Sequence, residues 1–331
     1  MKKKLALIMT AVMTATLMFT GCGKSEDDKK IKIAIVQPMS HTSLNQIRDT
    51  IISEIKAKGR DDIEIVTANA NGENSALTTI LENYKNENID IVVPIATSTA
   101  QSAKAVFDGK KTPQIFAAVS DPTAAGLTGD DCEYITGVSN NIPSAEIVKL
   151  ISNFQPEYKK IGFLYTSSET NSVSTIKSAK AYCDENNIAY EETSLANLSE
   201  LQTAVDTLIS KGVDALYTGN DNAIASAMPT YVDTAYAKKI PVYVGADSMV
   251  ADGGFATIGV DYVQLGKQTA EMIIKIIDGE KVASIPYETL SEYAKFINLQ
   301  SADKIGMTLT DEMLDGYKVL VEKDGESHFA K

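Results

Sequence analysis

The sequence predicts an α/β protein built from two doubly wound parallel-sheet lobes that are joined by a multi-strand hinge. Three observations predict this fold: short apolar runs alternate with helical patterns, the alternation occurs twice, and 331 residues suffice for two domains with separate cores. Continuous apolar strands between helices indicate parallel sheets covered on both faces, and right-handed crossovers then give each lobe its doubly wound topology.

An internal repeat supports the division into two lobes. Three strand-like runs recur in the same order at a nearly constant offset of 124 or 128 residues. The pairs are 32–36 with 160–164, 89–93 with 213–217, and 110–116 with 238–244. Such self-similarity indicates that one structural unit occurs twice.

Each copy has its own succession of elements. In the first we expect helices at 43–58 and 75–86, strands at 63–68 and 89–95, and a helix that begins at Thr97. In the second we expect helices at 172–186 and 198–211, strands at 189–193, 213–217 and 241–244, and a helix near Ala223.

The last part of the sequence predicts a return to the first lobe. Residues 259–266 open a long amphipathic helix that runs to about Asp278 and ends at Gly279, and strands are expected at 296–299 and 317–321. Crossings near 140–144, Gly259 and Pro286 divide the chain into lobe one, 31–142 plus 261–285, and lobe two, 143–260 plus 286–331. A hinge with several crossings encloses a cleft between the lobes.

The first residues predict export. A short positive stretch, Met1 to Lys4, precedes an apolar run at 5–19 that is too short to span a bilayer comfortably, so 1–21 is expected to be a signal peptide. The run 17–22, Leu-Met-Phe-Thr-Gly-Cys, resembles a bacterial lipobox, with Phe19 where Leu is usual. Lipidation of Cys22 would leave 22–30 as a tether, and an ordinary secretory signal is the alternative.

Composition favours binding over catalysis. The chain has 31 Lys and Arg against 44 Asp and Glu, a net charge of −13, with only two arginines, two histidines and no tryptophan. An acidic chain with few arginines argues against a nucleic-acid partner. The motifs of common hydrolases, nucleotide-binding loops and metal sites are absent, so we expect no enzyme activity, no cofactor and no metal. Cys132 and Cys183 fall in different lobes and are expected to be free thiols that are partly buried.

Six stretches together resemble one family, the substrate-binding lipoproteins of ABC importers for tryptophan and tyrosine. They are 95–101 (IATSTAQ), 116–122 (FAAVSDP), 135–139 (ITGVS), 164–172 (LYTSSETNS), 218–222 (TGNDN) and 261–266 (DYVQLG). The resemblance runs from about Ile31 to Gly306, and Thr170 stands where the family commonly has Ala. It implies a type I periplasmic-binding-protein fold, a monomer that closes like a Venus flytrap on tyrosine or tryptophan, and an ABC permease as partner.

The candidate ligand-binding residues follow the predicted strands, because ligands of open parallel sheets bind beyond the carboxyl ends of strands, near helix N-termini. Thr97, Ser98 and Thr99 begin a helix and suit a carboxylate, although plain capping is the alternative. The resemblance assigns Ser120 to the ligand's main-chain groups and Asp247 to its ammonium, with Asp221 and Glu169 as rivals for the ammonium. The other candidates are His41, Asp121, Tyr165, Ser167, Ser168, Asn171, Ser172, Asn220 and Asn222.

The wall for an aromatic ring is less well defined by sequence. Tyr165, Phe116 and Tyr217 lie at or near strand ends, but rings at such positions usually pack in the core. His41 lies in the first loop of lobe one, where a hydrogen-bonded loop role is the alternative to ligand contact.

Two other functions stay open on the sequence. A lipoprotein held outside a cell is displayed to other surfaces, so a surface interaction protein or adhesin is one of them. The same fold binding a nucleoside or a sugar is the second. A DNA-binding repressor shares this two-lobe fold, but here an export signal stands in place of its DNA-reading segment.

Overall fold

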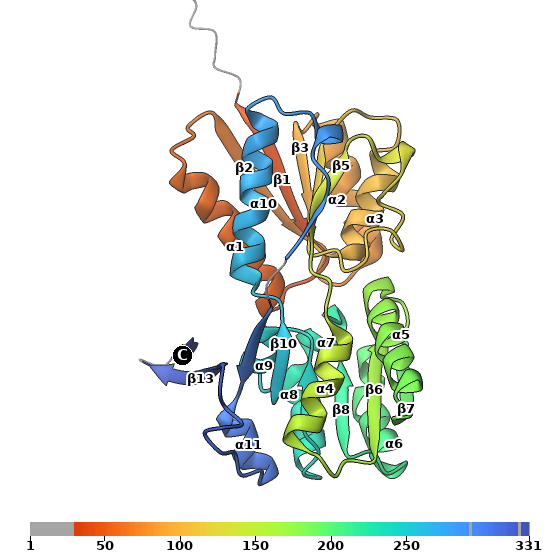
Figure 1. The fold of residues 1–331 in the computed structure, drawn as a ribbon. Coiled ribbons are helices and arrows are strands. Elements are labelled where there is room, and N and C mark those ends of the chain that lie inside the picture. Colours follow the sequence, from red (N-terminus) through yellow and green to blue (C-terminus); the bar gives the residue numbers. More distant parts are fainter. Residues whose placement is uncertain (1–29, 291–292, 324–325, 331) are drawn as a thin grey trace, which may run out of the picture. The chain divides into compact units, whose positions relative to one another are not determined.

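Two sheets of largely parallel strands, each with its own helices, form the protein (Figure 1). The computed structural model describes residues 30–290, 293–323 and 326–330. The predicted signal peptide and Cys22 lie outside these ranges. Residues Ile31–Lys331 form one compact unit, which holds both sheets.

The first sheet has the strand order β11-β5-β4-β3-β1-β2, and its strands pair in parallel throughout the described residues. Its strands are β1 (Ile31–Gln37), β2 (Ile63–Asn69), β3 (Ile91–Pro94), β4 (Gln114–Ala117), β5 (Ile135–Ser139) and β11 (Glu288–Thr289). Helices α1 (Thr42–Ala57), α2 (Asn74–Asn86), α3 (Thr97–Val106) and α10 (Tyr262–Ile277) complete this lobe, with the short turn η1 (Asp130–Cys132) and η3 (Val282–Ser284).

The second sheet has the order β14-β13-β12-β10-β9-β8-β6-β7. Its strands are β6 (Lys160–Thr166), β7 (Ala189–Leu195), β8 (Ala215–Thr218), β9 (Val242–Val244), β10 (Ala256–Gly259), β12 (Ala294–Ile297), β13 (Tyr317–Lys323) and β14 (Glu326–Ala330). The helices of this lobe are α4 (Ser144–Phe154), α5 (Thr170–Glu185), α6 (Leu201–Ser210), α7 (Asn222–Ser226), α8 (Met228–Tyr236), α9 (Asp247–Ala251) and α11 (Leu299–Ile305), with η2 (Leu198–Glu200).

The repeat in the sequence appears as a repeat in topology. The first five strands of each lobe have the same order, β2-β1-β3-β4-β5 in one sheet and β7-β6-β8-β9-β10 in the other. Each sheet therefore reverses its winding beside its first strand, which is the position where loops of doubly wound folds form binding sites. The second sheet differs at its far edge, where β12 runs antiparallel to β10 and β14 antiparallel to β13.

The long helix α10 anchors the returning chain to the first lobe. Asp261 caps its start by accepting hydrogen bonds from Val263 N at 3.0 Å and Gln264 N at 3.1 Å. It packs against α1 at Gly266, where an added Cβ would lie 2.7 Å from the Cβ of Thr50. The helix ends as expected, since Gly279 follows its last turn with a φ of +102°.

The structure corrects the predicted third crossing. Residues Glu288 and Thr289 pair in parallel with Val138 and Ser139 of β5, so they belong to the first sheet. The chain therefore leaves lobe one after Thr289 instead of at Pro286. Smaller differences lie at element ends: the predicted helix at 198–211 begins as a separate turn, η2, and the predicted strand at 89–95 begins at Ile91.

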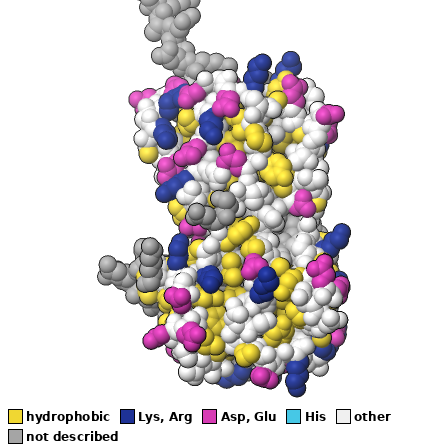
Figure 2. Space-filling view, in the orientation of Figure 1, with side chains coloured by type: hydrophobic (Ala, Val, Ile, Leu, Met, Phe, Trp, Pro, Cys, Tyr) yellow, Lys and Arg dark blue, Asp and Glu magenta, His cyan; other side chains and the backbone are white. Residues whose placement is uncertain are grey.

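Both cysteines in the described residues are free and buried. Cys132 lies in η1 of the first lobe and Cys183 in α5 of the second, as the sequence predicted, and both are buried more fully than expected. No helix within the described ranges combines the length and apolar character that a membrane span requires. On the face shown in Figure 2, lysines and arginines are interspersed with acidic side chains and form no continuous basic area.

Candidate functional site

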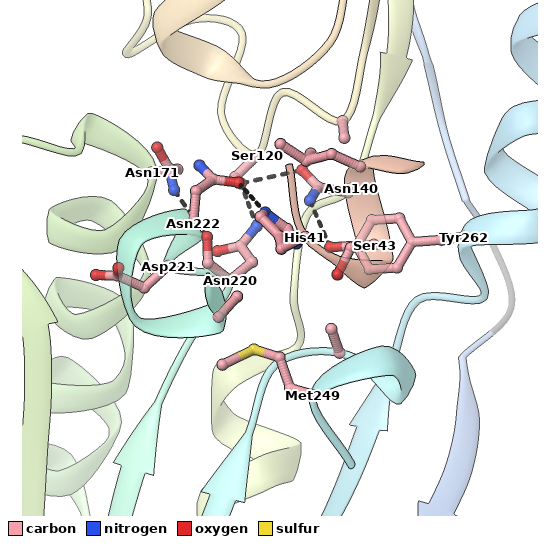
Figure 3. Close-up of a pocket in the computed structure, with 14 residues that line it drawn as sticks. His41, Ser43, Ser120, Asn140, Asn171, Asn220, Asp221, Asn222, Met249 and Tyr262 are labelled. Atoms are coloured by element: carbon pink, nitrogen blue, oxygen red, sulfur yellow. Dashed lines mark hydrogen bonds between the residues drawn. The ribbon is translucent and has the colours of Figure 1, made fainter. Parts of the chain in front are cut away.

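A small pocket lies between the lobes and receives side chains from both (Figure 3). Its volume is about 10 Å³, which is room for about one water molecule. The lining residues are His41, Ser43, Leu44, Ala118, Ser120, Asn140, Asn171, Asn220, Asp221, Asn222, Ala225, Ala246, Met249 and Tyr262. The set combines amides and hydroxyls with an apolar and aromatic part, and contains no lysine or arginine.

Direct hydrogen bonds join the lobes across this pocket. The ring Nε2 of His41, just before α1, lies 3.2 Å from Asn222 Oδ1 at the start of α7. Ser43 Oγ bonds Ser248 Oγ, and Asn220 Nδ2 donates to Ser120 Oγ. When the lobes are together, these polar side chains therefore use one another as hydrogen-bond partners. Separating the lobes would break all three contacts.

One hydrogen-bonded chain connects the pocket to the crossings between the lobes. Ser120 Oγ donates to Asn140 Oδ1 at 3.0 Å, and Asn140 Nδ2 donates to the hydroxyl oxygen of Tyr262, also at 3.0 Å. Asn140 follows β5 in the first crossing and Tyr262 begins α10 after the second. A ligand that displaces Ser120 or Asn140 would therefore act directly on the connecting segments.

Two acids near the pocket, Asp221 and Glu169, accept hydrogen bonds from backbone N–H groups in the first turn of α7. Asp221 is fully buried and accepts hydrogen bonds from Thr166 N at 2.6 Å, Thr166 Oγ1 at 2.9 Å and Ile224 N at 2.9 Å. Glu169 accepts from Asn222 N, Asn222 Nδ2, Ala223 N and Asn171 Nδ2 at 2.7–3.0 Å. Burial, followed by the charge of Asp221, raises the pKa of Glu169 to about 7, and burial also raises the pKa of Asp221.

Asp247 is a buried acid whose carboxylate can accept further hydrogen bonds. It begins α9, is 6 % exposed, and accepts a hydrogen bond from Ser248 N at 2.7 Å. Within the described residues this backbone N–H is its donor, no side chain donates a hydrogen bond to it, and it forms no ion pair. Burial raises the pKa of Asp247 to about 7, with a smaller contribution from Asp261. Asp247 itself does not line the pocket, although its neighbours in sequence Ala246 and Met249 do.

The predicted hydroxyl cluster at the start of α3 is buried beside the first sheet and does not line the pocket. The hydroxyls of Thr97 and Thr99 have no hydrogen-bond partner among the described residues, although both side chains are buried. Ser98 is partly exposed. Buried hydroxyls without partners carry a cost, which a carboxylate within reach would relieve.

Several other candidates lie away from the pocket. Tyr165 directs its hydroxyl to Glu192 at 3.4 Å, and Ser167 donates to the carbonyl of Leu195 at 3.0 Å, so both are tied to β7. Ser168 is exposed, and Ser172 is buried in the first turn of α5. Phe116 and Tyr217 are buried in the core, which was the alternative to a place in the wall of the pocket.

Asp121 lines a different groove between the lobes. Its carboxylate accepts from Ala124 N at 2.9 Å and from Ser174 Oγ, on α5, at 3.4 Å. The groove has a volume of about 320 Å³ and meets the pocket at Ser120.

The structure thus brings six predicted residues into the pocket: His41, Ser120, Asn171, Asn220, Asp221 and Asn222. Sequence reasoning missed the remaining lining residues. Asn140 and Tyr262 had a usable signal, because they lie in segments predicted to cross between the lobes. Ser43 and Met249 had none beyond closeness in sequence to His41 and Asp247.

Comparisons with known proteins agree on one family. A family model described as ABC transporter substrate binding protein matches residues 32–318. The tyrosine-binding protein of Clostridioides difficile (strain R20291) is 31% identical over 324 residues, which cover 92% of this chain and 93% of that protein. The fold resembles an ABC domain in complex with L-Trp from Streptococcus pneumonia, with a TM-score of 0.82 and 32% identity, over 88% of this chain and 99% of that one.

A further solved structure is the ligand-free, open form of a substrate binding protein with adhesive properties from Clostridium difficile. Its TM-score is 0.66 at 28% identity, and the match covers 88% of this chain and 99% of that chain. The two solved structures differ little in identity to this chain but clearly in TM-score. The whole-chain superposition is therefore better on the L-Trp complex than on the ligand-free, open form.

Proposed function

Because the chain belongs to the ABC transporter substrate-binding protein family, we propose that it captures free tyrosine or tryptophan between its lobes and delivers it to an ABC permease. The observation that carries the proposal is the pocket itself. Neutral amides and hydroxyls and an apolar wall line it, and the buried carboxylate of Asp247 follows the lining residue Ala246, a combination that suits a zwitterion with an aromatic side chain.

Each part of the ligand has a proposed partner. The ammonium pairs with Asp247, since Asp221 and Glu169 already accept hydrogen bonds from backbone N–H groups. The carboxylate is received by hydroxyl and amide groups of the first lobe that line the pocket, at Ser120 and Asn140. The ring packs against the apolar side of the pocket, where Leu44, Met249 and Tyr262 lie.

Capture works by hinge motion. A pocket of about 10 Å³ is far below the roughly 300 Å³ at which small-molecule sites begin, so the lobes must separate before an amino acid enters. The crossings supply the hinge, and closure on the ligand replaces the direct contact between Asn220 and Ser120 by contacts through the ligand while the contact between His41 and Asn222 forms again. The permease then recognises the closed form of the monomer.

We further propose that the chain is exported and held to the outer face of a bacterial cell membrane by a lipid on Cys22, which lies outside the described residues. Labelling cells with a radioactive fatty acid tests this. Wild-type protein should incorporate the label and sediment with membranes, and the Cys22→Ala variant should do neither. Labelling of the alanine variant would contradict the assignment.

A ligand screen tests the transport function. The chain without its first 22 residues is unfolded and refolded to remove bound ligand, then heated with each amino acid and with common sugars and nucleosides. At 100 times its Kd, the right ligand adds about 2.7 kcal/mol and raises the Tm by a few degrees. A shift with tyrosine or tryptophan supports the proposal, whereas a shift confined to sugars or nucleosides would refute the ligand while keeping the fold.

Adhesion is a second candidate function, favoured by the adhesive properties in the name of the Clostridium difficile neighbour. The two functions separate by mutation. Transport requires the pocket, so Asp247→Ala should abolish amino-acid binding. Attachment to a surface should survive that substitution.

A further inference from the structure

His41 lines the pocket and holds a buried ring nitrogen that no group of the described residues uses. The residue precedes α1, and its side chain makes no capping bond to the helix it begins. The ring instead reaches across to the second lobe, where Nε2 meets Asn222 (Figure 3). The other ring nitrogen, Nδ1, is buried and has no partner among the described residues.

The surroundings of Asn222 determine which nitrogen of His41 carries the hydrogen. The amide nitrogen of Asn222 donates to Glu169 Oε2 at 2.7 Å, which turns its oxygen towards His41. Glu169 acts as an acceptor here, because its two oxygens also receive Asn222 N, Ala223 N and Asn171 Nδ2. The oxygen of Asn222 needs a donor, so Nε2 of His41 carries the hydrogen and Nδ1 presents a lone pair.

The ring keeps this form at neutral pH. Burial lowers the pKa of His41 to about 4, with the bond to Asn222 opposing the shift, so the imidazole is neutral. A neutral ring with Nε2 protonated is an acceptor at Nδ1. Leaving a buried acceptor without a donor is unfavourable, and the pocket therefore favours an occupant that brings a donor to this point.

We propose that Nδ1 of His41 accepts a hydrogen bond from the ring of the ligand, the phenol O–H of tyrosine or the indole N–H of tryptophan, and so rejects phenylalanine. This inference rests on the proposed function and assigns it a specificity-determining residue. The ammonium is the other donor of an amino acid, but it is better matched to Asp247, which is an acid, than to a neutral ring. Phenylalanine has the same ring size as tyrosine and no donor, so it leaves Nδ1 unpaired.

The test measures ligand affinity by calorimetry for matched ligand pairs. Tyrosine is compared with phenylalanine, and tryptophan with 1-methyltryptophan, which lacks the indole N–H. Wild-type protein should prefer the donor-bearing member by about tenfold or more. In His41→Phe and in His41→Leu, neither of which carries an acceptor, the preference should fall towards one because only the donor-bearing ligand loses affinity.

Ser43→Ala is the matched control. It removes another hydrogen bond between the lobes, two residues along the chain, and should weaken both members of a pair equally. Equal binding of both members by wild-type protein would overturn the inference, as would an equal loss of both in the His41 variants. In either case binding itself would persist and the proposed function would stand. Binding of no aromatic amino acid by folded wild-type protein would instead refute the proposed function.

Discussion

Replacing Asp247 by Asn should weaken amino-acid binding strongly at pH 8 and hardly at all at pH 5. An ammonium requires the ionised carboxylate, but burial raises the pKa of Asp247 to about 7, so the wild-type side chain is neutral in mildly acidic solution. Binding below pH 7 must then expel a proton, and the wild-type affinity falls by about tenfold per pH unit. The Asn variant has no proton to lose and its affinity stays constant with pH.

The size of the effect follows from burial and charge. Removing one partner of a buried, hydrogen-bonded charge pair costs about 2 kcal/mol or more, which is about 30-fold in Kd at pH 8. The wild-type affinity should fall towards that of Asp247→Asn as the pH approaches 5, since both then present a neutral group. Asp261 and Lys318 are the charged groups that also act on Asp247, in opposite directions.

Calorimetry at pH 5, 6, 7 and 8 in two buffers of different ionisation enthalpy measures both the affinity and the number of protons released. Asp233→Asn, an exposed aspartate on α8, serves as the control and should behave as wild type. If Asp247→Asn retained the wild-type pH dependence, the reasoning would be refuted. Glu169, with its pKa of about 7, would then be the titrating group.

The same variant should be more stable than wild type before ligand is added. The pKa of Asp247 is higher in the folded protein, about 7, than in the unfolded chain, 3.8. The unfolded chain therefore ionises this carboxyl more readily, and the free energy of unfolding decreases as the pH rises from about 4 through 7. The loss is at most about 4 kcal/mol at pH 8. Asp247→Asn removes this penalty, and its Tm at pH 8 should exceed that of wild type. A lower Tm would contradict the assignment of a buried charge.

The remaining predictions concern closure, packing and the thiols. In the double variant Ser43→Cys/Ser248→Cys, a disulfide formed by oxidation should hold the lobes together, because the two side chains are in contact. Calorimetry should then detect no amino-acid binding until a reductant is added. Unchanged binding by the oxidised protein would show that the two residues do not separate when ligand enters. Gly266→Ala should lower the free energy of unfolding in urea by about 1–3 kcal/mol, because its Cβ meets Thr50, and a neutral effect would contradict the packing. Burial raises the pKa of Cys183 to about 11 and also raises that of Cys132, so neither should react with a thiol reagent at pH 8 until the protein unfolds, and rapid labelling of the native chain would disprove their burial.

Most of the fold was predictable because its signals are local. Apolar runs and helical periodicity mark the strands and helices in chain order, and the repeat shows that one order occurs twice. Strand β11 had no such signal. It is two residues long, Glu288 and Thr289, with no apolar pattern, and it is a strand only because β5 offers it a free edge. Pairing of this kind depends on tertiary structure, so the predicted crossing was wrong by a few residues.

The site was predictable where it follows the strands of the two sheets, as at His41 and Ser120 in the first lobe. Asn220, Asp221 and Asn222 directly follow β8, and loops at that edge of a doubly wound sheet face the partner lobe. Tyr165 failed for a geometric reason, because its hydroxyl reaches sideways to Glu192 on the neighbouring strand. Met249 was missed because contacts between lobes depend on how two separately folded units meet, which no local pattern records.

The hydrogen bonds that Glu169 and Asp221 receive from the start of α7 have a consequence for the evolution of binding. These acids support the start of α7, whereas no side chain of the described residues donates to Asp247 or to Nδ1 of His41. The side chains that support the fold, Glu169 and Asp221, therefore differ from those proposed to contact the ligand, Asp247 and His41. Under the proposed function, exchanging Asp247 and His41 would change the ligand and leave the hydrogen bonds that support α7 in place.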